Sequence, residues 1–276
     1  MEQRRRCDPE VVTDADARPE AVIRHVTHDF NRAILDETAH RPWKMPDGPW
    51  LMTQTWHDLL FAHWRVPPEA LRGSVPPNFP LDLFDGQAWI GIVPFHMTNV
   101  SPRGVPSLPW VSAFPELNVR TYVRVGDRPG VYFFSLDAGN PLAVRAARMV
   151  LNLPYYSASM VVMRRGDAVE YRSQREGDAD TAFHAIYGPA GAASPPAEGS
   201  LEYFLTERYC LYHLDHRGRP YRLEIHHPPW PLQPAHARLL QNTMAQASGL
   251  SLPHEAPLLH FVSRQDMVAW APSGVP

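Results

Sequence analysis

The sequence predicts an α+β fold made mainly of antiparallel strands, and three observations support this. From Trp50 onward the chain divides into short segments rich in β-branched and aromatic residues, separated by turn residues. The 30 prolines among 276 residues, about twice the usual share, fall mostly at the ends of these segments. Few segments have their apolar residues at helical spacing.

The composition excludes several classes of protein. With 26 basic and 29 acidic residues the formal charge is −3, which argues against a basic surface for nucleic acid. No apolar run approaches the roughly 18 residues of a membrane helix, and no apolar region follows the N-terminal arginines as in a signal peptide. Two cysteines, Cys7 and Cys210, are too few for a disulfide framework. We therefore expect a cytoplasmic protein without nucleic-acid or membrane partners.

The chain divides into an N-terminal extension, residues 1–48, and one domain, residues 49–276. Residues 1–20 are charged and nearly free of aromatics, which is typical of a mobile segment. Residues 21–39 have apolar positions near the helical period and predict one amphipathic helix. The Gly-, Ala- and Pro-rich stretch within residues 176–200 predicts a surface loop and no domain boundary, because strand patterning resumes after it.

Nine segments of the domain predict strands. They are Trp56–Val66, Gln87–Met97, Leu117–Val125, Val131–Asp137, Met160–Arg165, Ala168–Arg172, Leu201–Leu214, Tyr221–His227 and Leu258–Val262. Gly166-Asp167 has the length of a two-residue hairpin turn, and Asp215–Gly218 has the composition of a longer hairpin loop.

Three segments of the domain predict helices. A short one covers Pro68–Arg72. Asn140 and Pro141 are typical of a cap and first helical residue, and Pro154 ends that helix. A third helix is expected over Pro234–Ser248, with Gly249 terminating it. In the second helix one apolar stripe is formed by Leu142, Ala146, Met149 and Val150.

The chain lacks several common catalytic motifs. It contains no glycine-rich phosphate loop, no G-x-S-x-G elbow and no H-E-x-x-H helix. Among the 14 histidines, His226 and His227 are adjacent, and on a strand they point to opposite faces. They bind one metal ion only if the chain bends at Pro228. We expect neither a metal nor a cofactor.

The segment from Pro115 to Val123 carries the clearest candidate site. With period two, one face of a strand carries Glu116, Asn118, Arg120 and Tyr122, while the opposite face is apolar. This row either faces solvent, with Glu116 and Arg120 paired, or lines a pocket. In a pocket, Arg120 would hold a carboxylate and Glu116 would serve as acid or base.

Two further segments bring polar groups toward the interior. Tyr155 and Tyr156 follow the second helix and either pack in the core or line a pocket. Glu207 and Arg208 are adjacent in a segment crowded with aromatics, so one of these charges is expected inside, where it needs a partner. His57 and His96 are weaker pocket candidates.

These segments together resemble the YqjF-like family, an uncharacterised family of the acetoacetate decarboxylase-like superfamily. The resemblance covers about residues 50–272. It rests on an ordered run of motifs: Leu59–Trp64, Phe84–Trp89, Glu116–Val123, Phe133–Ala138, Leu153–Tyr156, Gly199–Tyr212 and Ile225–Gln233.

The resemblance implies a curved antiparallel sheet that closes into a barrel-like core with an internal pocket and a few outer helices. It also implies a chemistry, because the decarboxylases form a Schiff base on a lysine that follows an aromatic-proline step. Here that step looks like Leu153-Pro154, and Tyr155 and Tyr156 come next. The glutamate of the decarboxylase pocket is similar in position to Glu116. Lys44, the one lysine of the chain, precedes the matching region.

Three functions remain open from the sequence. The chain is an enzyme of lyase or isomerase type that acts on a small oxo-acid or carbonyl compound without a Schiff base, a non-catalytic ligand-binding module, or a structural protein. In the first, Tyr155 or Tyr156 would donate a hydrogen bond to an enolate, Glu116 would move a proton and Arg120 would hold a carboxylate. The expected partner is a small organic acid or carbonyl compound.

The oligomeric state is also open. Barrels of this kind often associate, and exposed tryptophans would favour a homo-oligomer. The candidates are Trp50, Trp110 and Trp230.

Overall fold

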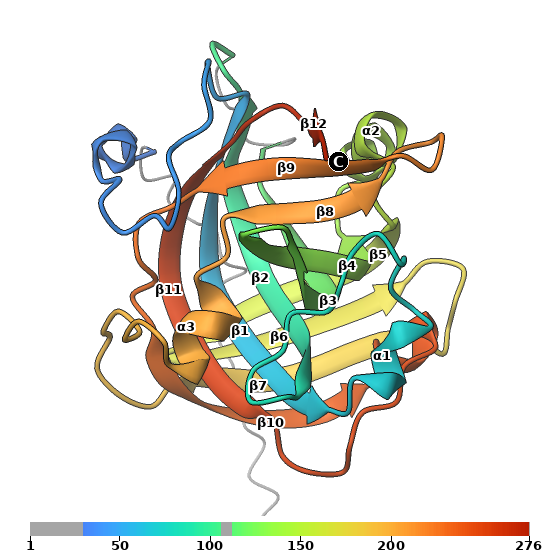
Figure 1. Cartoon of the computed structure of the whole chain (residues 1–276). Helices are drawn as coiled ribbons and strands as arrows, with labels where there is room; N and C mark the ends of the chain where they lie inside the picture. The colour runs from blue at the N-terminus through green and yellow to red at the C-terminus, as the bar shows by residue number, and fades with distance from the viewer. Residues whose placement is uncertain (1–29, 106–111, 276) are drawn as a thin grey trace, which may run out of the picture.

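In the computed structural model, which describes residues 30–105 and 112–275, the chain forms one twelve-stranded sheet that closes on itself (Figure 1). The strand order is β12-β9-β8-β4-β3-β2-β1-β11-β10-β7-β6-β5. Neighbouring strands are antiparallel, except that β4 runs parallel to both β5 and β8. The strands are β1 Met52–Val66, β2 Ala88–Pro102, β3 Phe114–Val125, β4 Arg128–Ala138, β5 Tyr155–Arg165, β6 Ala168–Arg175, β7 Ala182–Pro189, β8 Cys210–Leu214, β9 Pro220–His226, β10 Gln233–Asn242, β11 Leu258–Ala269 and β12 Ser273–Gly274.

Short helices cover the ends of this sheet. The described residues contain three α-helices, α1 Glu69–Arg72, α2 Pro141–Leu151 and α3 Leu201–Thr206, and two 3₁₀ turns, η1 Arg32–Asp36 and η2 Gln246–Ser248. No helix in this part of the chain is long and apolar enough to span a membrane.

Two extra strand pairings divide the sheet into two rings. Pairing of β4 with β5 closes nine strands, β4-β3-β2-β1-β11-β10-β7-β6-β5, into a barrel. Pairing of β9 with β11 closes seven strands, β9-β8-β4-β3-β2-β1-β11, into a smaller ring. Strands β1 to β4 and β11 belong to both. Because side chains alternate along a strand, each shared strand sends one face into each ring.

The nine-strand barrel contains the main apolar core. Side chains from β1, β2, β3, β6, β7 and β11 interdigitate there, with Leu117 and Val119 contributed by β3. Two fully buried tyrosines in this core place their hydroxyls on backbone carbonyls: Tyr171 donates to the Glu116 carbonyl at 2.8 Å and Tyr187 to the Asp58 carbonyl at 2.8 Å. The barrel is therefore filled and leaves the smaller ring to hold a cavity.

Most of the predicted local structure is confirmed. Asn140 caps α2 by accepting from the backbone amides of Leu142 and Ala143, and the helix ends at Asn152 in the left-handed conformation. Gly166, with φ of 61°, turns the β5–β6 hairpin, and residues 215–218 turn the β8–β9 hairpin. The apolar stripe of α2 mostly faces solvent, because the helix packs on the sheet through Val144.

Three predictions are wrong. Leu201–Leu214 is not one strand, because Ser200 caps the six-residue helix α3 by accepting from the Tyr203 amide, and only β8 is extended. The expected helix over Pro234–Ser248 is strand β10 followed by η2, since its exposure alternates residue by residue. The third error is an omission: β7 lies within residues 176–200 and buries Phe183 and Tyr187, although no strand was predicted there, while the Gly-, Ala- and Pro-rich stretch after it is largely loop.

Residues 30–48, here called the N-terminal strap, pack on the outer side of β9 and β11 (blue in Figure 1). Of the amphipathic helix expected over residues 21–39, only the 3₁₀ turn η1 is found, with Ile34 buried against Val268 and Trp270; residues 1–29 lie outside the described part. Trp110 also lies outside it, Trp50 is half-buried and Trp230 is buried.

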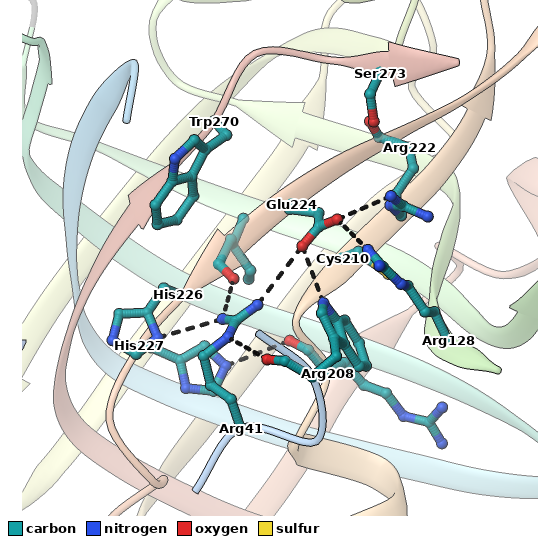
Figure 2. A network of polar contacts seen from close by, with 12 residues as sticks. Arg41, Arg128, Arg208, Cys210, Arg222, Glu224, His226, His227, Trp270 and Ser273 are labelled. Carbon is teal, nitrogen blue, oxygen red and sulfur yellow. Dashed lines mark hydrogen bonds and ion pairs between the residues drawn. The ribbon is translucent and has the colours of Figure 1, made fainter. Parts of the chain in front are cut away.

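A cluster of arginines around one carboxylate attaches the strap (Figure 2). Glu224 of β9 forms ion pairs with Arg41 of the strap at 3.7 Å, Arg128 at 2.6 Å and Arg222 at 2.9 Å, and it accepts from the Trp43 indole at 3.0 Å. Arg41 also donates to the Ile225 carbonyl at 2.8 Å. A single buried carboxylate thus compensates three guanidinium groups.

We predict that Glu224→Gln destabilises the fold by about 3 to 5 kcal/mol, because it leaves several buried or half-buried guanidiniums without their counter-charge. Urea unfolding followed by tryptophan fluorescence measures this. The matched change Asp215→Asn, at an exposed ion pair with Arg219, serves as control and should shift the midpoint far less. Equal effects of the two substitutions would contradict the assigned role of Glu224.

Candidate functional site

The seven-strand ring encloses a cavity of about 140 Å³. Its wall is mostly apolar, and residues from β1, β2, β3, β4, β8, β9 and β11 contribute to it. The polar side chains that line it are Gln54, Glu116, Asn118, Arg120, Tyr155, Thr206 and Arg208. A mostly apolar pocket with few polar groups is typical of a small-molecule site.

Strand β3 places the predicted polar row in this cavity. Glu116, Asn118 and Arg120 all line it, while Leu117 and Val119 on the other face enter the core of the nine-strand barrel. Glu116 is 4% exposed and Asn118 5% exposed, so the alternative of a solvated outer face is wrong. The structure also shows no ion pair between Glu116 and Arg120 among the described residues.

Glu116 is a buried carboxyl group without a cationic partner in the described structure. Its Oε2 accepts a hydrogen bond from the Tyr155 hydroxyl at 2.9 Å. Burial raises the pKa of Glu116 to about 8; the Tyr155 hydrogen bond opposes this shift and the charge of Asp137 adds to it. At neutral pH Glu116 is therefore mostly protonated and can donate a proton, and its ionised form, which can accept one, appears near pH 8.

The chain turn after α2 decides which tyrosine enters the cavity. Asn152 ends the helix, Pro154 follows, and the Pro154 carbonyl accepts from the Leu136 amide at 3.0 Å, which starts β5 beside β4. Tyr155 then points inward to Glu116. Tyr156, the next residue, points outward, is 38% exposed and lies against the guanidinium of Arg175 at 3.8 Å.

Arg120 is held by neutral groups. Its Nη2 donates to the Tyr122 hydroxyl at 3.3 Å and to the Leu205 carbonyl at 3.2 Å. Tyr122 donates its own proton to the Leu205 carbonyl at 2.8 Å, so it accepts from the Nε2 of buried His63 at 2.6 Å. Gly91 lies beside the side chains of His63 and Arg120. A Cβ at this position would approach both of them to about 3.2 Å.

Two of the weaker candidates lie outside the cavity. His57 on β1 and His96 on β2 face each other across the strand pair, with ring centroids 6.4 Å apart, and His57 contacts the Thr98 hydroxyl at 2.8 Å. Neither lines the cavity, because their neighbours Trp56 and Phe95 do and the strand alternates. The prediction that the pocket is lined by His57, His96 and Tyr156 is therefore wrong.

Arg208 lines the cavity although it was expected only as an interior charge. It follows α3, is 5% exposed, and donates to Asp82 at 2.6 Å and to the Phe204 carbonyl at 2.6 Å. Its neighbour Glu207 is buried too, and accepts from the Trp230 amide at 3.0 Å and from the Tyr209 hydroxyl. Both charges are therefore buried, where the sequence predicted one, and they do not pair with each other.

Comparison with known proteins assigns the family. Residues 53–266 match the model of the DUF2071 family, described as an uncharacterized conserved protein (COG2071). The chain is 49% identical over 226 residues to the uncharacterized protein YqjF of Bacillus subtilis (strain 168), covering 82% of this chain and 93% of that protein. The chain belongs to the DUF2071 family.

Solved structures with this fold are distant in sequence. The enduracididine biosynthesis enzyme MppR complexed with pyruvate superposes with a TM-score of 0.59 at 12% identity, covering 84% of this chain and 93% of MppR. Acetoacetate decarboxylase from Legionella pneumophila gives 0.55 at 13% identity, covering 90% and 97%. The DUF2071 chain therefore has the acetoacetate decarboxylase-like fold, as the sequence resemblance implied.

The described part of this DUF2071 protein offers few nucleophiles for the cavity. Lys44, the one lysine of the sequence, is exposed on the strap and does not line the cavity. Cys210 reaches the wall, but burial raises the pKa of its thiol to about 12, so it stays protonated near neutral pH. The described residues contain no group of three or more His, Cys, Asp or Glu placed to hold a metal ion.

The raised pKa of Glu116 predicts a specific pH dependence of stability. Between pH 4.5 and 8 the unfolded chain has lost this proton while the folded chain retains it, so the contribution of Glu116 to stability falls as pH rises. The loss is about 1.4 kcal/mol per pH unit within this window. We predict that the stability difference between the native chain and Glu116→Gln falls accordingly in urea titrations at successive pH values.

A control distinguishes this effect from general titration. Glu170 has a pKa lowered by the hydrogen bond from Arg172, so its contribution is lost only as pH falls. Glu170→Gln should therefore show no such fall between pH 4.5 and 8. A flat difference for Glu116→Gln would show that Glu116 is ionised in the folded protein.

Proposed function

We propose that this protein binds a small organic acid in the cavity of the seven-strand ring and moves a proton at the carbon beside its carbonyl group, without a Schiff base. The observation that carries the proposal is the presence of two unlike groups in the wall of one cavity. Glu116 is a carboxyl group that titrates near neutral pH, and Arg120 is a guanidinium with no carboxylate partner in the described structure.

The size of the cavity supports a small ligand. An apolar protein cavity of roughly 150 Å³ holds a benzene molecule, and this cavity measures about 140 Å³. Pyruvate has the same number of non-hydrogen atoms as benzene. The structural neighbour MppR is described as complexed with pyruvate, which makes 2-oxo acids the first ligands to test.

The strand geometry separates the two ends of the ligand. Glu116 and Arg120 are four residues apart on β3, about 13 Å between Cα atoms at 3.3 Å per residue, and their side chains extend into the space between. Arg120 would bind the carboxylate with donors that its present contacts leave unused. The carbonyl end would then lie near Asn118, whose Oδ1 has no hydrogen-bond partner in the described structure, and Glu116.

In this arrangement the chemistry is an enolisation. Ionised Glu116 takes the proton from the carbon beside the carbonyl group, and the electron pair of the broken C–H bond moves to the carbonyl oxygen. Once Glu116 is neutral, the Tyr155 hydroxyl is free to donate to the enolate oxygen and stabilise its charge. Return of a proton from Glu116 to carbon restores the keto acid.

The proposal predicts exchange of substrate hydrogen with solvent. In deuterated water, pyruvate or 2-oxobutyrate should gain deuterium at the carbon beside the carbonyl, as measured by proton NMR. Glu116→Gln should reduce the rate by about 100-fold or more, the usual range for loss of a general base. Because the base form of Glu116 appears near pH 8, the rate should rise with pH up to that value.

The adjacent tyrosines provide a matched control. Tyr155→Phe should slow the exchange, whereas Tyr156→Phe should leave it unchanged, because Tyr156 faces outward against Arg175. Binding of the acid without exchange would favour the alternative of a non-catalytic binding module. If no such acid binds, the proposal is wrong and the alternative of a structural protein is favoured.

The absence of a Schiff base has its own test. Tyr155 occupies the position at which the resemblance to the decarboxylases implies a lysine. The phenol of a tyrosine cannot form an imine. We predict that incubation with acetoacetate and borohydride leaves the mass of the protein unchanged. A reduced adduct on Lys44 would contradict this, and Lys44→Arg would then abolish the adduct.

A further inference from the structure

The cavity wall carries a second arginine, which the proposed function does not use. The guanidinium carbons of Arg120 and Arg208 both lie over the ring of Tyr122, at 5.6 and 5.0 Å from its centroid. Both also donate to carbonyls at the end of α3, Arg120 to Leu205 and Arg208 to Phe204. The two positive groups therefore converge on the same part of the wall, while Glu116 and Tyr155 form another part.

The carboxylates in the described structure do not balance these charges. Arg120 forms no ion pair there. Arg208 pairs with Asp82 at 2.6 Å, but Asp82 also pairs with Arg124 at 3.0 Å, so one carboxylate serves two guanidiniums. With Glu116 protonated, the guanidinium of Arg120 has no counter-charge at the cavity wall, and Arg208 shares the carboxylate of Asp82 with Arg124, whose side chain is 45% exposed. An uncompensated charge in a buried site is costly unless a ligand supplies the counter-charge.

Capping of α3 does not account for both arginines. Each guanidinium has five N–H donors, and the contacts to the Leu205 and Phe204 carbonyls use one donor of each. Arg120 keeps a buried Nε without a hydrogen-bond partner, and the hydrogen bonds of Arg208 to the described residues use its Nε and Nη1 and not its Nη2. Donors therefore remain at both guanidiniums for carboxylate oxygens.

We propose that the cavity binds a short dicarboxylate, with one carboxylate held by Arg120 and the other by Arg208. This inference rests on the proposed function and narrows its substrate class to an oxo diacid. The middle of such a ligand is short and apolar, which suits the aliphatic and aromatic wall. Malonate and succinate are only slightly larger than the molecules for which a cavity of about 140 Å³ has room.

Matched acids test the proposal on the native chain. Isothermal titration calorimetry at pH 6.5 would compare succinate with butyrate and malonate with propionate, which differ by one carboxylate at the same chain length. We expect each diacid to bind at least tenfold more tightly than its monoacid. Arg208→Met should remove this advantage of the diacid over its monoacid, while Arg120→Met should weaken both acids.

The outcomes separate the two proposals. If a monoacid binds and its diacid binds no better, the dicarboxylate inference is overturned and the proposed function stands. If neither binds, both fail. A tenfold preference that survives Arg208→Met overturns the role given to Arg208. Arg172→Met, an exposed arginine outside the cavity, is the control and should change neither affinity. The comparison on the native chain needs no variant, so a folding defect of Arg208→Met leaves it intact.

Discussion

Strand β3 is enclosed on both faces, and this constraint organises the rest of the molecule. Because β3 belongs to the nine-strand barrel and to the seven-strand ring, most of its residues are buried on both faces, and Arg124 near its end is the exposed one. Its apolar face fills the barrel. Its polar face, Glu116, Asn118 and Arg120, lines a cavity whose polar groups have few protein partners. The site exists because polar groups are enclosed by a closed sheet.

Buried ionisable side chains are accommodated in this molecule in three ways: by protonation, by shared ion pairs and by hydrogen bonds to neutral groups. Glu116 remains protonated, because burial raises its pKa. Single carboxylates serve several guanidiniums, as Glu224 does on the outer side of β9 and Asp82 beside the cavity. Arg120 depends on carbonyl and hydroxyl oxygens alone. The first and third leave polar groups at the cavity wall without a charged partner in the described structure, whereas the Glu224 cluster attaches the strap.

The comparison with solved structures shows a shared fold and does not show a shared reaction. Structural neighbours at 12 to 13% identity share the closed sheet, and such a likeness carries the architecture without the reaction. In this chain the position after Pro154 is a tyrosine that contacts Glu116, and the lone lysine lies on the strap. The wall of the cavity therefore has the Tyr155–Glu116 hydrogen bond in place of a lysine at this position.

The sequence by itself determined the fold class, most strands, the cap of α2 and the row of Glu116, Asn118 and Arg120, because these depend on local spacing and turn chemistry. It did not distinguish Tyr155 from Tyr156, because only the pairing of β5 with β4 sets which side chain turns inward. It assigned β10 to a helix, since short apolar runs suit both periods. The place of Arg208 in the cavity wall came from closure of the seven-strand ring. Ring closure brings together residues far apart in sequence, and no local pattern encodes such contacts.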